Sequence, residues 1–132
     1  MTRAAAITRA TAGANKLWAG TVTINPNAKT GPHHHGKLES VIYVIRGRAR
    51  MRWGERLEFI AEAGPGDFIY VPPFVPHQEI NASRDEPLAC VLVRNDQDTA
   101  GGVARGDILG RPYPSASLME FPMFRKRNEH GS

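Results

Sequence analysis

The chain has 132 residues, of which 41% are hydrophobic and 23% charged, enough for one domain with a real core and too few for two. Its net charge of +4 is modest, and its basic residues are scattered rather than gathered into a nucleic-acid-binding patch. The single cysteine, Cys90, excludes an internal disulfide, and no apolar run approaches the roughly 20 residues that span a membrane. The first residues lack the apolar stretch of a secretory signal, so we expect a cytoplasmic protein.

Turn signals recur about every ten residues, as in all-β sandwiches and barrels, and no stretch keeps a helical period. Residues 1–16 are rich in Ala and Thr and are expected to form an N-terminal arm. Residues 17–94 are expected to form the barrel core, and 95–132 an irregular C-terminal segment that wraps the surface or frays. Within the core, the predicted strands are 17–24, 40–45, 48–53, 56–63, 68–71, 77–82 and 88–94.

Three consecutive histidines begin at His33, ahead of the strand at 40–45. On an extended chain His33 and His35 project to the same side, which is a chelating arrangement for a divalent metal. Glu39 has the same parity as both, and His77 follows a Pro-Pro turn from which a hairpin brings it alongside. Three imidazoles and one carboxylate suit Zn, Fe, Mn or Ni and leave positions for water or substrate. His34 points the other way and is expected at the surface or behind the ligands.

The sequence around these histidines resembles the cupin family. That family's second motif, G(X)5PXG(X)2H(X)3N, is matched by GDFIYVPPFVPHQEIN, from Gly66 through His77 to Asn81, with Phe74 in place of the middle glycine. Its first motif, G(X)5HXH(X)3–4E(X)6G, is matched by HHHGKLESVIYVIRG, with Asn27 at the leading glycine.

The spacing of the first motif leaves two assignments open. Seven residues rather than six separate Glu39 from Gly47, so counting back from Gly47 places the family's carboxylate at Ser40. Either Glu39 is a ligand and a bulge absorbs one residue, or Ser40 takes the position and the site has three histidines. We favour Glu39, because a hydroxyl is a poor ligand and the HXH(X)3E spacing is intact.

The resemblance implies a jelly-roll barrel (a double-stranded β-helix) with one divalent metal ion inside and a small-molecule substrate entering from the mouth. Glu39 is expected to be a metal ligand or the general base, and Tyr43, Gln78 and Phe74 to line the substrate pocket. The expected activity is dioxygenation, isomerisation, or decarboxylase or cyclase chemistry. A metal-free enzyme working by His and Tyr, as in cupin epimerases, and a non-catalytic binding module are the alternatives. The resemblance to single-domain cupins also implies a homodimer.

Four arginines alternate along the strand at 48–53 and the residues before it, namely Arg46, Arg48, Arg50 and Arg52. They form either a basic stripe for nucleic acid or a solvated outer face that acidic side chains neutralise across a hairpin. No aromatic side chains interleave with them, so we favour the solvated face. We therefore predict neither a nucleic-acid partner nor a membrane partner.

Overall fold

The computed structural model describes residues 1–95 and the backbone of 124–126. It is built almost entirely from antiparallel strands, as the turn pattern predicts. The seven strands expected between residues 17 and 94 are all present, with boundaries shifted by three residues at most: β2 (Trp18–Ile24), β3 (Ser40–Arg46), β4 (Ala49–Trp53), β5 (Phe59–Ala63), β6 (Phe68–Val71), β7 (His77–Asn81) and β8 (Leu88–Arg94).

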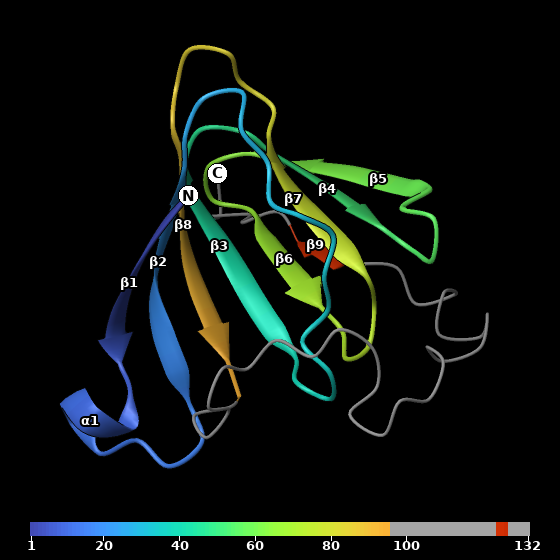
Figure 1. Ribbon diagram of the computed structural model, residues 1–132. Coiled ribbons are helices and arrows are strands. Elements are labelled where there is room, and N and C mark those ends of the chain that lie inside the picture. The colour runs from blue at the N-terminus through green and yellow to red at the C-terminus, as the bar shows by residue number, and fades with distance from the viewer. Residues whose placement is uncertain (96–123, 127–132) are drawn as a thin grey trace.

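Two sheets face each other, as Figure 1 shows. The larger has the strand order β1-β2-β8-β3-β6-β9, and the smaller has the order β5-β4-β7. Because pairing joins strands far apart in sequence, such as β2 with β8, the chain closes around one core. This arrangement is the all-β jelly roll predicted from the sequence.

The core lies between the two sheets, and strict alternation along the strands defines its wall. On β3 the inward side chains are Ser40, Ile42 and Val44, all buried, whereas Val41 and Ile45 point outward and are exposed. Cys90 on β8 is buried among apolar side chains. Burial raises the pKa of its thiol to about 12, with a further contribution from Glu79, so Cys90 is a core residue and no nucleophile.

Residues 1–16, expected to be an arm, contain two regular elements. Strand β1 (Thr2–Ile7) pairs antiparallel with β2 at the edge of the larger sheet, and the short helix α1 (Arg9–Ala12) follows it. Every side chain of β1 is exposed. Its pairing therefore depends on backbone hydrogen bonds to β2, which an Ala-rich sequence without apolar alternation does not reveal. The C-terminal segment lies outside the described residues, except that β9 (Phe124–Lys126) pairs with β6.

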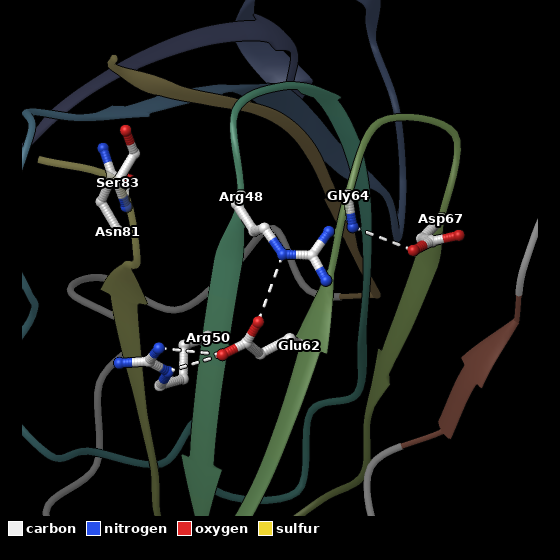
Figure 2. Close-up of polar contacts among 7 residues, drawn as sticks. All are labelled: Arg48, Arg50, Glu62, Gly64, Asp67, Asn81 and Ser83. Carbon is white, nitrogen blue, oxygen red and sulfur yellow. Dashed lines mark hydrogen bonds and ion pairs between the residues drawn. The ribbon is translucent and has the colours of Figure 1, made fainter. Parts of the chain in front are cut away.

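Of the four alternating arginines, Arg48, Arg50 and Arg52 lie on the hairpin of β4 and β5, whereas Arg46 ends β3. Figure 2 shows Glu62 of β5 between Arg48 and Arg50, at 3.2 Å from Arg48 Nε and 2.9 Å from Arg50 Nη2. Arg52 donates from its Nε to the Leu57 carbonyl. The acidic neutralisation expected across the hairpin is thus present at Glu62. Among the described residues, no helix is long and apolar enough to cross a membrane.

Backbone conformation explains the glycine positions of the two motifs. Gly47 has φ 91°, and a Cβ there would lie 2.6 Å from the Pro87 carbonyl oxygen, so the turn after β3 needs glycine. Asn27 and Phe74 stand where the cupin motifs have glycine, and both adopt the left-handed region, with φ of 61° and 63°. Asn tolerates this conformation, whereas for Phe it is strained. The chain thus keeps the backbone of the motif where its residues differ.

Candidate metal centre

His33, His35 and His77 converge at one end of the barrel. One ligand nitrogen from each lies within 4.8 Å of the others. An isolated bridge pairs His33 with His77 through reciprocal backbone hydrogen bonds of 2.9 and 2.8 Å, so the segment before β3 lies directly against the start of β7. The three histidines singled out by their spacing are therefore brought together in space, as a group that could hold a metal ion.

Hydrogen bonds to backbone carbonyls fix the tautomer of two of the imidazoles. His33 Nδ1 lies 2.8 Å from the Gly31 carbonyl, and His77 Nδ1 lies 3.0 Å from the Val75 carbonyl. A carbonyl only accepts, so each Nδ1 carries the proton and each Nε2 keeps a lone pair for a metal. His35 Nδ1 is buried and has no hydrogen-bond partner among the described residues. These donors fit a divalent ion.

Two of the imidazoles, His35 and His77, are held in the neutral form that metal binding requires. Burial, followed by the neighbouring His77 and His33 and then by Arg94 and Arg3, lowers the pKa of His35 to about 3. Burial and the neighbouring His33 likewise lower the pKa of His77 to about 3. Near neutral pH neither residue has to lose a proton before it can bind a metal.

The structure does not bring Glu39 to the histidines. Its side chain is exposed and accepts a hydrogen bond of 2.9 Å from the Tyr70 hydroxyl on the outer side of β6. Ser40, the next residue, is 3% exposed and points inward, and its Oγ has no hydrogen-bond partner among the described residues. Of the two assignments left open by the spacing, the geometry matches the one with three histidines and Ser40 at the carboxylate position.

A bulge is present in β3, but it lies beyond this point. The pairing with β8 shifts between Val44 and Arg46, while the alternation from Ser40 to Val44 is unbroken. The parity between the histidines and Glu39 is lost earlier, at a turn in which Gly36 has φ 63° and the Leu38 amide donates to the His35 carbonyl. A turn between two residues cancels the same-face rule that holds within one strand.

The other predicted pocket residues are spread over several surfaces. Tyr43 lies on the outer side of β3, where its ring centroid is 4.7 Å from that of Phe68. Gln78 lies on the opposite side of β7 from His77 and donates to the Thr30 carbonyl. Phe74 remains beside the site, with its ring 6.4 Å from that of His34. His34, expected at the surface or behind the ligands, is fully buried and accepts a hydrogen bond from the Gly36 amide through Nδ1.

Two further charged residues lie near the centre, and neither is a position of the cupin motifs. Glu79 lies on the inward side of β7, two residues after His77, and lines a small cavity with apolar side chains of both sheets. Burial raises the pKa of its carboxyl, against the influence of His33 and Arg3. Arg94 lies at the end of β8, paired in register with Ser40. Strand parity was the signal that could have placed both residues inside, but neither belongs to a motif.

Residues 20–94 match the family described as the cupin domain, and the chain belongs to this family. No curated protein matches the chain significantly. Fold, motif order and family assignment therefore agree.

The solved structures that are similar include oxalate decarboxylases from Bacillus subtilis. One mutant form of that enzyme is 26% identical with a TM-score of 0.63, covering 74% of this chain and 26% of that one. A second variant, altered at a tryptophan, is 25% identical with a TM-score of 0.65, covering 76% and 27%. This chain thus spans about a quarter of the length of those proteins. A protein from Bacillus halodurans, 22% identical with a TM-score of 0.63, matches 78% of this chain over 76% of its own length and shares the fold.

Proposed function

We propose that the protein is a metal-dependent cupin enzyme acting on a small organic molecule, with one divalent ion held by His33, His35 and His77. The observation that carries this proposal is the convergence of three ligand nitrogens within 4.8 Å. The bonds from Nδ1 of His33 and of His77 to backbone carbonyls support it, because they leave each Nε2 with a lone pair for a metal. Zn, Fe, Mn and Ni all suit such donors. One similar oxalate decarboxylase is described as having Mn(II) centres, so Mn(II) is the first metal to test.

An ion with open coordination positions would polarise a carbonyl, stabilise an enolate or bind dioxygen, which covers oxygenase, isomerase and decarboxylase or cyclase chemistry. The chain's own part is to hold three imidazoles at the end of a largely apolar inner wall. We leave Glu39 out of the proposed ligand set because it is bonded to Tyr70 on the outer face. Ser40, with its short side chain, leaves more room at the centre than a glutamate would.

A non-catalytic binding module is the second candidate. The observation that favours it is the outward position of Glu39, because the residue expected as general base is then absent from the metal centre. A module of this kind would retain the ion and bind a small molecule without turnover. Turnover screens with and without oxygen, run on metal-loaded protein, separate this role from the enzymatic one.

We also propose a homodimer in the cytoplasm. Exposed apolar side chains gather on the outer face of the larger sheet, where Val41 and Ile45 of β3 lie beside Phe68 of β6. A second copy covering this face would remove that surface from water. Light scattering at micromolar concentrations should give twice the monomer mass, and a monomer at every concentration would contradict the dimer.

Elemental analysis of protein purified without a histidine tag tests the metal proposal. We expect close to one divalent ion per chain in the wild type and a large loss in His35→Ala and in His77→Ala. Lys37→Ala, an exposed change within the same segment, is the matched control and should retain the ion. Circular dichroism of each variant checks that the fold is intact. A folded wild type that takes up no ion when offered Mn, Fe, Zn or Ni would refute the proposal.

A further inference from the structure

A row of three side chains crosses the inner face of the larger sheet at the end where the histidines converge. Arg94 of β8 is paired in register with Trp18 of β2 on one side and with Ser40 of β3 on the other. All three side chains point inward. The residues two positions along the same strands, Gly20, Leu92 and Ile42, are buried, and side chains two positions apart share a face. An arginine is unusual in such a wall, because charged side chains are seldom turned toward a core.

The Arg94 guanidinium is held over an aromatic ring. Its central carbon lies 4.8 Å from the Trp18 ring centroid, within the range of a cation–π contact. Arg3 of β1, paired with Val22, brings a second guanidinium to 5.9 Å from the same ring. Two positive charges therefore share one indole at the mouth of the barrel. A cation–π contact of this kind restricts where the guanidinium lies and so limits where its hydrogen-bond donors can reach.

These charges lie at the end of the barrel where the histidines converge, since Arg94 is paired with Ser40 at the start of β3. Arg94 and Arg3 are both close enough to contribute to the lowered pKa of His35, after burial and the two neighbouring imidazoles. The same end of the barrel holds three buried polar atoms without a hydrogen-bond partner among the described residues: His35 Nδ1, Ser40 Oγ and Trp53 Nε1. Trp53 is the register partner of His77. Buried polar atoms without a protein partner indicate a place that a polar ligand or water occupies.

We infer that Arg94, held over Trp18 by a cation–π contact and assisted by Arg3, binds a carboxylate group of the substrate at the end of the barrel where the three histidines converge. Ser40 Oγ is the neutral donor on the adjacent strand. A planar guanidinium matches a carboxylate through two parallel hydrogen bonds, and the short Ser40 side chain leaves space for the ligand. The inference rests on the proposed function only in placing a metal ion at the other end of the same substrate molecule. It adds the substrate class, a small carboxylic acid.

The test is titration of metal-free and Mn-loaded protein with malonate, followed by tryptophan fluorescence and confirmed by calorimetry. Malonamide has the same shape without charge and is the matched ligand control, and inorganic phosphate distinguishes a carboxylate site from a general anion site. We expect malonate to bind, malonamide not to bind, and phosphate to bind at least about tenfold more weakly than malonate. Arg94→Gln should weaken malonate binding at least about tenfold, as expected for the loss of a charged bidentate contact.

Three further variants keep the result interpretable. Arg94→Lys retains the charge without the planar fork and should give an intermediate loss. Arg3→Gln changes an exposed residue and should weaken binding a few fold. Arg46→Gln, on the exposed end of β3, should change nothing. Thermal melting of each variant separates loss of binding from loss of fold, and Arg3→Gln carries the test if Arg94→Gln unfolds.

Equal binding of malonate and malonamide would overturn the inference. It would also be overturned if Arg3→Gln, and Arg94→Gln where that variant folds, bound malonate as tightly as the wild type. Metal content is measured on the same samples, so the two proposals fail separately. Malonate binding that depends on Arg94 in a protein that takes up no metal when it is offered would refute the metal centre and support the carboxylate site. Stoichiometric metal with binding independent of both arginines would do the reverse.

Discussion

The two segments that supply the histidines reach the same centre by different means. His77 begins a regular strand, β7, whose pairing with β4 fixes which side chains face the core. His33 and His35 lie in an irregular segment that is held by the bridge to His77 and by the Phe74 amide, which donates to the Gly36 carbonyl at 2.7 Å. The strand segment thus provides the frame on which the irregular one is positioned. Within a regular strand, alternation decides which face a side chain lies on, whereas beyond a turn its direction depends on contacts with other segments.

Acid should disturb both segments together and is the largest effect we expect. The pKa of His35 and of His77 is lowered from 6.5 to about 3, chiefly by burial, so in metal-free protein the unfolded chain binds more protons between these values. Stability is therefore complete above pH 6.5 and falls as the pH is lowered, by up to about 1.4 kcal/mol per pH unit for each histidine. Urea unfolding at pH 6.5, 5.5 and 4.5 measures this slope.

Glu79 provides an internal control for that slope. Burial raises the pKa of its carboxyl, so the folded state holds this proton more tightly and Glu79 opposes the loss of stability on acidification. Glu79→Gln removes the opposition and should make the slope steeper. A stability that is flat between pH 6.5 and 4.5, in wild type and Glu79→Gln alike, would contradict the buried neutral histidines.

Asn81 ends the strand segment, and its removal should destabilise the frame by about 2–4 kcal/mol. Its Nδ2 donates to the carbonyls of Ile24, Asn25 and Glu86 at 3.1, 3.2 and 2.8 Å, and its Oδ1 accepts from the Ser83 amide at 2.9 Å. Asn81→Ala removes all four of these hydrogen bonds from a largely buried corner of the barrel. Chemical denaturation measures the loss, and Asn25→Ala, on an exposed side chain, should change stability by less than about 0.5 kcal/mol. Equal effects of the two changes would be evidence against a bracing role.

Phe74 tests whether the motif preserves a backbone conformation rather than a residue. At ordinary positions alanine is more stable than glycine by about 0.4–1 kcal/mol, but at the φ of 63° seen here the order should reverse. We expect Phe74→Gly to be more stable than Phe74→Ala by about 1 kcal/mol. Asn27, with φ 61°, should show the same order for its glycine and alanine variants. Thermal melts of the four proteins measure both differences, and alanine variants that match or exceed glycine would show that the left-handed turns are dispensable.

Much of the barrel could be predicted because its strands carry strong local signals. The β-branched stretch from Ser40 to Ile45 forms β3, and the two prolines after Val71 end β6 as expected. The edge strand β1 could not be predicted, because its alanines carry no alternation and its order comes from pairing with β2. The three-histidine group was predictable because two of its members are neighbours in sequence and the third lies in a motif.

The sequence is weakest at side chains that depend on the course of a turn or on pairing between strands. Glu39 and Ser40 differ by one position, and a one-residue slip exchanges the two faces of a strand. Only the turn at Gly36 decides which of them faces inward. Arg94 and Trp18 are distant in sequence and meet through the pairing of β2 with β8. No motif records such a contact.

The smallest effects should come from changes at the adjacent residues Glu39 and Ser40, one of which is exposed and the other buried. Ser40→Ala removes a buried hydroxyl that has no hydrogen-bond partner among the described residues, and Glu39→Ala removes one exposed hydrogen bond. Each change should therefore alter stability by less than about 1 kcal/mol. Both variants should keep close to one ion per chain. In Glu39→Ala the pKa of Tyr70, which burial and then the bond to Glu39 raise, should move back toward 10.0.

Spectroscopic titration of the tyrosines detects that shift and shows that Glu39 is bonded on the outer face. Loss of the ion in Glu39→Ala, with Ser40→Ala unaffected, would instead make Glu39 a ligand and require the turn at Gly36 to open in the metal-bound protein. Retention in both variants leaves three imidazoles as the protein's whole contribution to the ion. The remaining coordination positions are then available to substrate or water, on the side where Ser40 and Arg94 lie.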